Sequence, residues 1–117
     1  MTLSDRQSSF LLDVARLIFW CHSHGYKVTA GECYRTDYQQ KEYRRQGKTT
    51  VSHSKHQDRL AIDLNLFVDG VSMWEMSEDM QRLQFKKIWT QWESLRAGNE
   101  AGGLWENFYD PCHFEAA

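Results

Sequence analysis

The sequence lacks a long apolar segment, and it has only one proline and no excess of positive charge. The longest apolar run near the N-terminus, residues 10–21, is interrupted by Asp13 and Arg16, so it is too short and too charged to span a bilayer. There is no basic segment followed by a clean apolar stretch and a small-residue cleavage site. We therefore expect no signal peptide, no membrane insertion, and a protein kept in the cytoplasm until something releases it.

The charge balance and the few cysteines exclude further classes of protein. Fourteen Lys and Arg residues against 16 Asp and Glu residues give a formal net charge of −2. A nucleic-acid-binding surface needs a basic patch, so we expect no nucleic-acid partner. The three cysteines, Cys21, Cys33 and Cys112, show no CxxC spacing, which argues against a disulfide framework and a cysteine-only zinc site. We expect all three to be buried free thiols.

Apolar periodicity and capping residues predict three helices and few strands. The helices are expected at about residues 5–24, 36–45 and 77–97, and the strands at 60–68, 71–74 and 113–115. Ser4, Thr36 and Ser77 are the expected N-caps. The residues expected on the buried side of the last helix are Met80, Leu83, Ile88, Trp92 and Leu95. Helices and strands do not alternate strictly. We therefore predict an α+β fold with a small, mostly antiparallel sheet flanked by two main helices.

Asp63 lies in the middle of a segment that otherwise has the pattern of a buried strand. In residues 60–67, Leu and Ile alternate with smaller or polar residues, which is typical of a strand with one face in the core. A carboxylate in such a place must be compensated by a cation, by hydrogen bonds or by a metal ion. Two explanations stay open at this stage: a buried ion pair, with Arg35 as the obvious partner, or a metal site.

Side chains that could bind a metal ion occur in two groups. The groups are His53, His56 and Asp63 in the middle of the chain, and Asp110, His113 and Glu115 near its end. A catalytic zinc site needs three such ligands and one open position. His56 from a loop, Asp63 from the strand and His113 from a neighbouring strand would satisfy that need. Asp110 would then lie beside the open position, where a carboxylate can move a proton during hydrolysis.

Three sequence blocks resemble a known enzyme family. Ser54-Lys55-His56 followed by Ala61-Ile62-Asp63 is similar to the signature S-x-H-x-x-G-x-A-x-D. The segment "GGLWENFYDPCHFE" resembles G-G-x-W…D/E-x-x-H-F-E, and "CYRTDYQQ" resembles Y-R-S/T-x-x-x-Q. These are blocks of the zinc D-Ala-D-Ala carboxypeptidase and L-alanyl-D-glutamate endopeptidase family, which includes VanY-like peptidases and phage endolysins. The resemblance implies an α+β fold whose antiparallel sheet carries one zinc ion.

The resemblance also implies a role for several residues. Its metal ligands correspond to His56, Asp63 and His113, and its catalytic carboxylate corresponds to Asp110. Its arginine, which stabilises charge on the scissile carbonyl, corresponds to Arg35. One zinc ion per chain is implied. Ser54, Trp105 and Tyr109 are candidate substrate-binding residues. The ordinary alternatives are a local loop hydrogen bond for Ser54 and core packing for the two aromatic residues.

One residue departs from the family signature. Arg59 stands where the signature has glycine. Glycine permits a turn with positive φ, so the arginine suggests a slightly different path for the loop next to His56.

The implied function is zinc-dependent hydrolysis of amide bonds in the peptidoglycan stem peptide. We expect residues 1–117 to form a single, monomeric zinc peptidase domain. The short chain without a signal sequence or wall-binding module favours an L-alanyl-D-glutamate endopeptidase acting as a phage or prophage endolysin. The enzymatic alternative is a D,D-carboxypeptidase. The alternative from another class is a non-catalytic domain stabilised by zinc, for which Cys112 or His53 would have to supply a fourth ligand.

Overall fold

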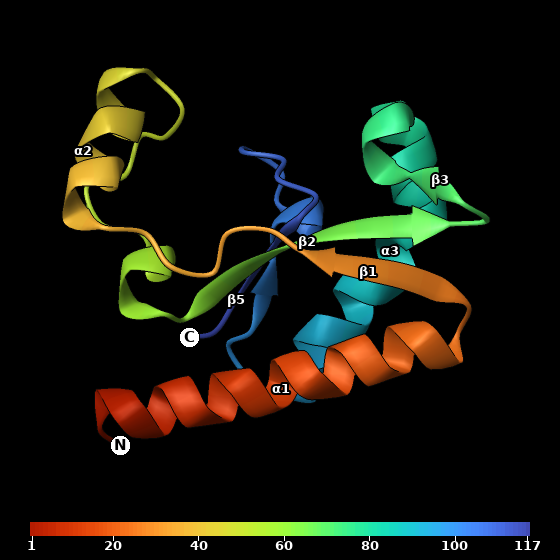
Figure 1. Cartoon of the computed structure of the whole chain (residues 1–117), viewed down its shortest axis with the longest axis horizontal. Coiled ribbons are helices and arrows are strands. Elements are labelled where there is room, and N and C mark those ends of the chain that lie inside the picture. Colours follow the sequence, from red (N-terminus) through yellow and green to blue (C-terminus); the bar gives the residue numbers. More distant parts are fainter.

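Two long helices and a small sheet form the body of the computed structural model, which describes all residues 1–117 (Figure 1). Helix α1 spans Leu3–Ser23 and helix α3 spans Glu78–Leu95. These two helices contact each other, and α1 also contacts the first strand. A shorter helix, α2, spans Asp37–Arg45 and stands away from α1 and α3 (Figure 1).

The helix caps follow the sequence pattern with one correction. Thr36 with Gln39 forms the expected capping box of α2, and the Ser77 side chain accepts a hydrogen bond from the Met80 N–H at the start of α3. The prediction of Ser4 as the first cap is wrong. Thr2 caps α1 instead, in a capping box with Asp5, so the helix starts earlier than expected.

The sheet has five strands, and every pair is antiparallel. The strands are β1 (Tyr26–Ala30), β2 (Ala61–Val68), β3 (Val71–Ser72), β4 (Glu100–Ala101) and β5 (His113–Glu115). Their order is β1-β2-β5-β4, with β3 also paired to β2. The second half of β2 pairs with β1 and its first half pairs with β5. The α+β fold predicted from the sequence, with a small antiparallel sheet and two main helices, is confirmed.

The hydrophobic core lies where α1 and α3 pack against the sheet. Its largest members are Trp89, Trp92, Phe85 and Phe114, each at most 1% exposed. The prediction that Met80 and Leu83 face inward is wrong, because both are exposed. The buried stripe of α3 is Gln81, Phe85, Ile88, Trp89 and Trp92, a set with the spacing of a single helix face.

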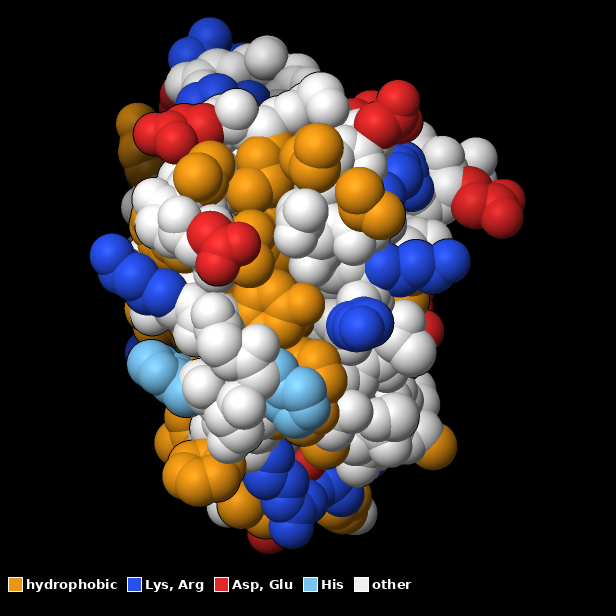
Figure 2. Space-filling model, turned by 90° about the vertical axis from the view of Figure 1, so that its right-hand side faces the viewer, with side chains coloured by type: hydrophobic (Ala, Val, Ile, Leu, Met, Phe, Trp, Pro, Cys, Tyr) orange, Lys and Arg blue, Asp and Glu red, His pale blue; other side chains and the backbone are white.

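The surface carries both apolar and charged side chains (Figure 2), and the cysteines form no disulfide. On the face shown in Figure 2, hydrophobic side chains gather along the middle, with charged side chains of both signs around them. None of the helices combines the length and the apolar character needed to cross a membrane. All three cysteines are free, as expected. Cys21 is buried and Cys112 is half-buried, but Cys33 is exposed, so the expectation of burial is wrong for Cys33.

Candidate metal centre and active site

The register between β2 and β5 places Asp63 directly opposite His113. Residues directly opposite each other in an antiparallel pair point to the same side of the sheet. His56 comes from a short 3-10 helix, Lys55–Asp58, that immediately precedes β2. The Ser54 hydroxyl caps this helix by accepting a hydrogen bond from the His56 N–H, at 3.2 Å. The 3-10 helix and the adjoining β2 therefore meet the distant strand β5, and this brings His56, Asp63 and His113 together.

The three side chains form a tight cluster. Nε2 of His56 lies 3.3 Å from Oδ1 of Asp63, and Nδ1 of His113 lies 3.5 Å from the same oxygen. One ligand atom from each residue can be chosen such that all lie within 4.8 Å of one another. The histidines are buried, with side chains 2% and 8% exposed, and Asp63 is 24% exposed.

The cluster has the features of a site built for a divalent metal ion. Oδ1 of Asp63 is buried and has no hydrogen bond of good geometry, although two imidazole nitrogens lie close to it. Such a group is costly to bury unless a cation compensates it. Two imidazoles and a carboxylate are a donor set that suits zinc, with three protein ligands and room for a fourth position. The residues present therefore fit the metal ion that the sequence resemblance implies.

The electrostatics of the cluster favour a positive charge. Burial raises the pKa of Asp63, but the neighbouring His113 and His56 imidazoles outweigh it and bring the pKa down to about 2. Burial lowers the pKa of His113, but the carboxylates of Asp63, Glu115 and Asp110 outweigh it and raise the pKa to about 9. A pKa of about 9 favours a second proton on the His113 ring of the metal-free protein at neutral pH. A metal ion must displace that proton.

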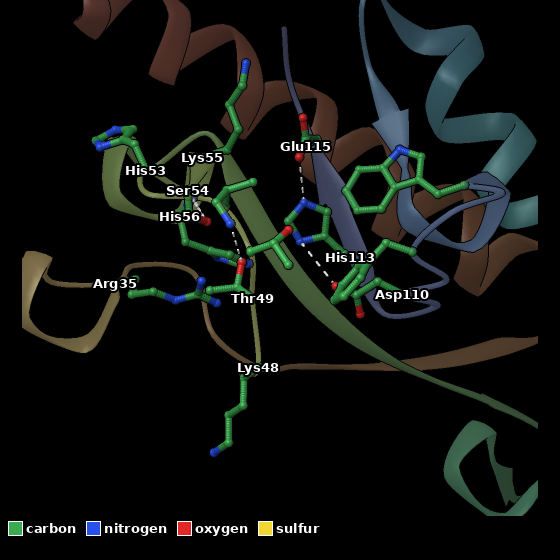
Figure 3. Close-up of a pocket in the computed structure, with 14 residues that line it drawn as sticks. Arg35, Lys48, Thr49, His53, Ser54, Lys55, His56, Asp110, His113 and Glu115 are labelled. Carbon is green, nitrogen blue, oxygen red and sulfur yellow. Dashed lines mark hydrogen bonds and ion pairs between the residues drawn. The ribbon is translucent and has the colours of Figure 1, made fainter. Parts of the chain in front are cut away.

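Glu115 fixes the orientation of His113. Oε1 of Glu115 accepts a hydrogen bond from Nε2 of His113, at 2.8 Å (Figure 3). This contact leaves Nδ1 of His113 as the nitrogen that faces Asp63. A carboxylate behind a histidine commonly sets the tautomer and the ring orientation of a metal ligand.

Asp110 lies next to the cluster, as the sequence predicts. Its Oδ2 is 4.0 Å from Nδ1 of His113, and its Oδ1 accepts a hydrogen bond from the Cys112 thiol at 3.6 Å. Burial raises the pKa of Asp110, and the nearby Asp63 carboxylate adds to this effect, while His113 opposes it. A carboxylate that holds its proton more readily than usual is suited to general acid–base work.

Gly102 holds the backbone of Asp110 in place. The Asp110 N–H donates a hydrogen bond to the Gly102 carbonyl, at 3.0 Å. A Cβ at Gly102 would come within 2.3 Å of the Asp110 carbonyl oxygen. Only glycine allows this close approach, which explains why residue 102 is a glycine.

Arg35 is held by Glu32 and Gln40. Its Nη2 and Nε lie 2.6 and 2.8 Å from Oε1 of Glu32, and its Nη1 donates to Oε1 of Gln40 at 2.8 Å. The alternative in which Arg35 compensates Asp63 is therefore wrong, because the nearest charge partners of Asp63 are His56 and His113.

The sequence analysis missed Glu32. Besides binding Arg35, its Oε1 lies 3.7 Å from Nδ1 of His56. Its backbone carbonyl accepts a hydrogen bond from the Asp63 N–H, at 2.8 Å. The only signal in the sequence was that Glu32 lies three residues before Arg35. Such a spacing brings side chains together on a helix, but this segment was expected to be extended, so the spacing predicted no contact.

A cavity of about 390 Å³ opens beside the cluster (Figure 3). Arg35, Asp110 and His113 line it, together with Trp105 and a loop that begins at Lys48. The indole of Trp105 lies 5.1 Å from the His113 ring, measured between centroids. The structure thus brings the candidate catalytic residues to one cavity, with an aromatic wall beside them.

Two of the three candidate substrate-binding residues lie at the cavity. Trp105 and Ser54 line it, although the Ser54 hydroxyl also makes the local loop hydrogen bond described above. Tyr109 does not line this cavity. Its ring packs edge-on against Trp89, and its hydroxyl donates to Oε1 of Gln81 at 2.8 Å. Tyr109 is drawn toward α3 by these contacts and is a packing residue.

Arg59 adopts the backbone conformation that glycine favours. Its φ of 55° and ψ of 38° lie in the left-handed region. The expectation that this residue diverts the loop to another path is therefore wrong. Its guanidinium lies over the Tyr34 ring, 4.0 Å from the centroid, and this contact offsets part of the cost of the strained backbone.

The candidates for a fourth protein ligand are engaged elsewhere. The Cys112 thiol donates a hydrogen bond to the Asp110 carboxylate. Nε2 of His53 lies 3.0 Å from Oδ1 of Asp58. The cluster itself contains only His56, Asp63 and His113. A structural zinc site is closed by four protein ligands, so this arrangement is typical of a catalytic site.

Comparisons with known proteins agree with the geometry. A model of the family described as D-alanyl-D-alanine carboxypeptidase, in peptidase family M15, matches residues 47–116. The fold is similar to the crystal structure of the Serratia marcescens L-Ala D-Glu endopeptidase ChiX. The TM-score is 0.68 at 21% identity, over 97% of this chain and 85% of that chain. A search of curated proteins found no match.

An α+β scaffold with three clustered metal-ligand side chains and a carboxylate beside an open cavity defines a metal-dependent peptidase. The family match extends over more than half of the sequence and includes all three side chains. The chain belongs to the M15 family of D-alanyl-D-alanine carboxypeptidases, and it is a metallopeptidase that acts on peptidoglycan.

Proposed function

We propose that this protein is an L-alanyl-D-glutamate endopeptidase that serves as a phage or prophage endolysin. It would be a monomer with residues 1–117 as one peptidase domain, and it would reach the cell wall only after release from the cytoplasm. The observation that carries the proposal is the cluster of His56, Asp63 and His113 with Asp110 beside it at the cavity. Fold similarity to an L-Ala D-Glu endopeptidase supports the choice of bond.

His56, Asp63 and His113 would hold the metal ion, which we propose to be zinc, one per chain. When bound, such an ion supplies Lewis-acid activation of water and of the scissile carbonyl at neutral pH. The contribution of the chain is to orient the two imidazoles. Glu115 does this for His113 through its hydrogen bond to Nε2.

Asp110 is the proposed general base and general acid. Its carboxylate lies at the cavity wall beside His113, where it can accept a proton from the attacking water. The same carboxylate then protonates the departing amide nitrogen. The Cys112 thiol and the Gly102 carbonyl hold the side chain and backbone of Asp110 in this position.

Arg35 is the proposed stabiliser of negative charge on the scissile carbonyl oxygen. Its guanidinium lines the same cavity as Asp110, and its orientation is fixed by Glu32 and Gln40. Preorganised positive charge of this kind typically contributes a few kcal/mol to transition-state stabilisation. Ser54 and Trp105 are the proposed substrate contacts at the wall of the cavity.

Digestion of defined muropeptides tests this function. The zinc-loaded protein is incubated with purified sacculi and with soluble pentapeptide muropeptides, and products are identified by mass spectrometry after labelling of new amino groups. We expect new N-termini at D-Glu. A protein that binds one zinc ion tightly and releases no fragment from either substrate would contradict the proposal.

The same experiment tests the second candidate, a D,D-carboxypeptidase. The description of the matching family, D-alanyl-D-alanine carboxypeptidase, favours this reading. Free D-Ala from the pentapeptide, without new amino groups at D-Glu, would identify the carboxypeptidase and exclude the endopeptidase.

A further inference from the structure

Gln40 is the one buried residue of helix α2. Only 1% of it is exposed, although the other residues of this helix are exposed or half-buried. A buried amide needs hydrogen-bond partners for both its oxygen and its nitrogen. The partners of Gln40 therefore show what it does in the fold.

Both partners of Gln40 belong to the cavity. Its Oε1 accepts a hydrogen bond from Nη1 of Arg35, at 2.8 Å. Its Nε2 donates to the backbone carbonyl of Val51, also at 2.8 Å. Arg35 and Val51 both line the cavity, but they come from different segments of the chain. One side chain thus links the arginine to the loop beside it (Figure 3).

The loop that contains Val51 has few other attachments. Residues 46–54 form no helix or strand, and Lys48, Thr49, Thr50, Val51, His53 and Ser54 line the cavity. Between residues 49 and 53 the backbone makes a single hydrogen bond to a group outside the loop, which is the bond from Gln40. Lys48 and His53 attach the ends of the loop, through the Tyr43 carbonyl and the Asp58 carboxylate, so it is the middle of this wall, at Val51, that depends on Gln40.

Arg35 also depends on Gln40 for its orientation. Glu32 binds Nε and Nη2 through a single carboxylate oxygen, which is one hydrogen-bonded fixed point, and the face of the guanidinium lies over the Tyr43 ring, 4.7 Å from its centroid. The bond from Nη1 to Gln40 supplies the second fixed point. Two partners on different edges of a planar group define its plane, which is what a preorganised cation needs.

We infer that Gln40 is a positioning residue that holds the guanidinium of Arg35 and the neighbouring 48–54 loop together at one wall of the cavity. It acts on the substrate only through these two groups. The inference rests on the proposed function of Arg35 in peptide hydrolysis, and it adds a residue that controls both the charge stabilisation and the position of the loop that lines the substrate cavity.

Three variants test this inference with zinc-loaded protein and a soluble muropeptide substrate. Gln40→Met keeps the length of the side chain and removes both hydrogen bonds. We expect kcat to fall by roughly 10- to 100-fold, the scale of a misplaced catalytic group. Zinc content should equal that of the wild type. Hydrogen exchange of backbone amides in residues 48–54 should become faster.

Gln40→Glu separates the two contacts. It retains an acceptor for Arg35 but cannot donate to the Val51 carbonyl. We expect kcat near the wild-type value, a raised KM and faster amide exchange in the loop. Gln46→Met is the matched control, because Gln46 lies exposed at the end of the same helix and makes no side-chain hydrogen bond. It should match the wild type in every measurement.

A double-mutant cycle identifies the route of action. In an Arg35→Ala background, Gln40→Met should cause no further loss of kcat, because its effect on catalysis passes through the arginine. Full additivity, a loss of zinc in Gln40→Met, or unchanged kcat and loop exchange in that variant would each overturn the inference. If the wild-type protein releases no product, the proposed function fails, and the exchange measurement alone then decides whether Gln40 tethers the loop.

Discussion

On β5, the side chains of His113 and Glu115 point to the same side of the sheet, and Nε2 of His113 donates to Oε1 of Glu115 at 2.8 Å. This bond commits the other ring nitrogen of His113 to Asp63, 3.5 Å away. The orientation of one metal ligand is thus determined by a residue that does not touch the metal position. The relationship leads directly to the first prediction.

Glu115→Gln should weaken metal binding without removing a ligand. The amide can still approach His113, but it no longer favours the tautomer that leaves Nδ1 free. We expect metal affinity to fall by about 10- to 100-fold, as is common when such a carboxylate is replaced. Competition with a chelator of known affinity measures this change. Glu106→Gln, at an exposed position, is the control and should bind the ion like the wild type.

Asp63→Asn should abolish tight zinc binding while the fold is retained. The variant keeps the shape of the side chain but removes the charge that the two imidazoles surround. Elemental analysis should give close to one zinc per chain for the wild type and close to none for the variant. His53→Ala should keep its zinc, because His53 pairs with Asp58. A zinc-free His53→Ala protein would show that the ligand set has been misassigned.

Arg35→Ala should reduce kcat and leave the zinc content unchanged. The arginine contacts Glu32 and Gln40 and makes no contact with Asp63, so the metal ligands do not depend on it. Removal of one oxyanion-stabilising group typically costs about 10²- to 10³-fold in kcat. Steady-state kinetics and elemental analysis of the same preparation test both parts. Loss of zinc together with activity would instead assign Arg35 a structural role.

Gly102→Ala should displace Asp110. The new methyl group would meet the Asp110 carbonyl oxygen and Cβ, which are backbone and near-backbone atoms that cannot move aside independently. We expect a strong fall in kcat with zinc still bound. Gly25→Ala is the comparison, because Gly25 has a positive φ but no atoms near its missing Cβ. It should lower thermal stability and leave kcat unchanged, so a general loss of stability cannot explain the effect at Gly102.

Arg59→Gly should leave the metal site intact. Arg59 already adopts the left-handed conformation of a glycine, so the substitution relieves strain and removes the stacking on Tyr34. The two effects are each on the order of 1 kcal/mol and oppose each other. Thermal unfolding should therefore show a small change in Tm, with zinc content and kcat unchanged. A large change in kcat would show that Arg59 contributes to substrate binding.

The placement of the metal-ligand side chains was accessible from the sequence because short motifs carry it. His56 and Asp63 lie seven residues apart on either side of a single loop-to-strand transition, and His113 lies in a strand with its own sequence signature. The local structure that the motif needs, a capped turn followed by a strand, is specified by neighbouring residues. Only the pairing of β2 with β5 had to be supplied by the fold.

The contacts of Arg35 could not be predicted in this way. Gln40 stands at the glutamine of the segment that resembles Y-R-S/T-x-x-x-Q, but the resemblance does not give its partners, and nothing local distinguishes Glu32 from a solvent-exposed acid. Their roles arise from side-chain contacts in the folded chain, which have no periodicity in the sequence. The same limit explains Tyr109, because its place beside glycine-rich and catalytic segments suggested the cavity, whereas its hydroxyl found Gln81 in α3.

The buried side of α3 could be predicted only in part. Ile88 and Trp92 lie in the buried stripe as expected, whereas Met80 and Leu83 are exposed and Phe85 and Trp89 complete the stripe instead. When two apolar stripes compete on one helix, packing against the rest of the core decides. Sequence periodicity alone gives the helix and leaves its rotation open.

Anomalous diffraction at the zinc absorption edge, from crystals grown with zinc, tests the central claim most directly. We predict a single strong peak bonded at about 2.0–2.2 Å to His56, Asp63 and His113, with the fourth position open to the cavity. A peak elsewhere, or an ion closed off by Cys112 or His53 as a fourth protein ligand, would contradict a catalytic metal centre.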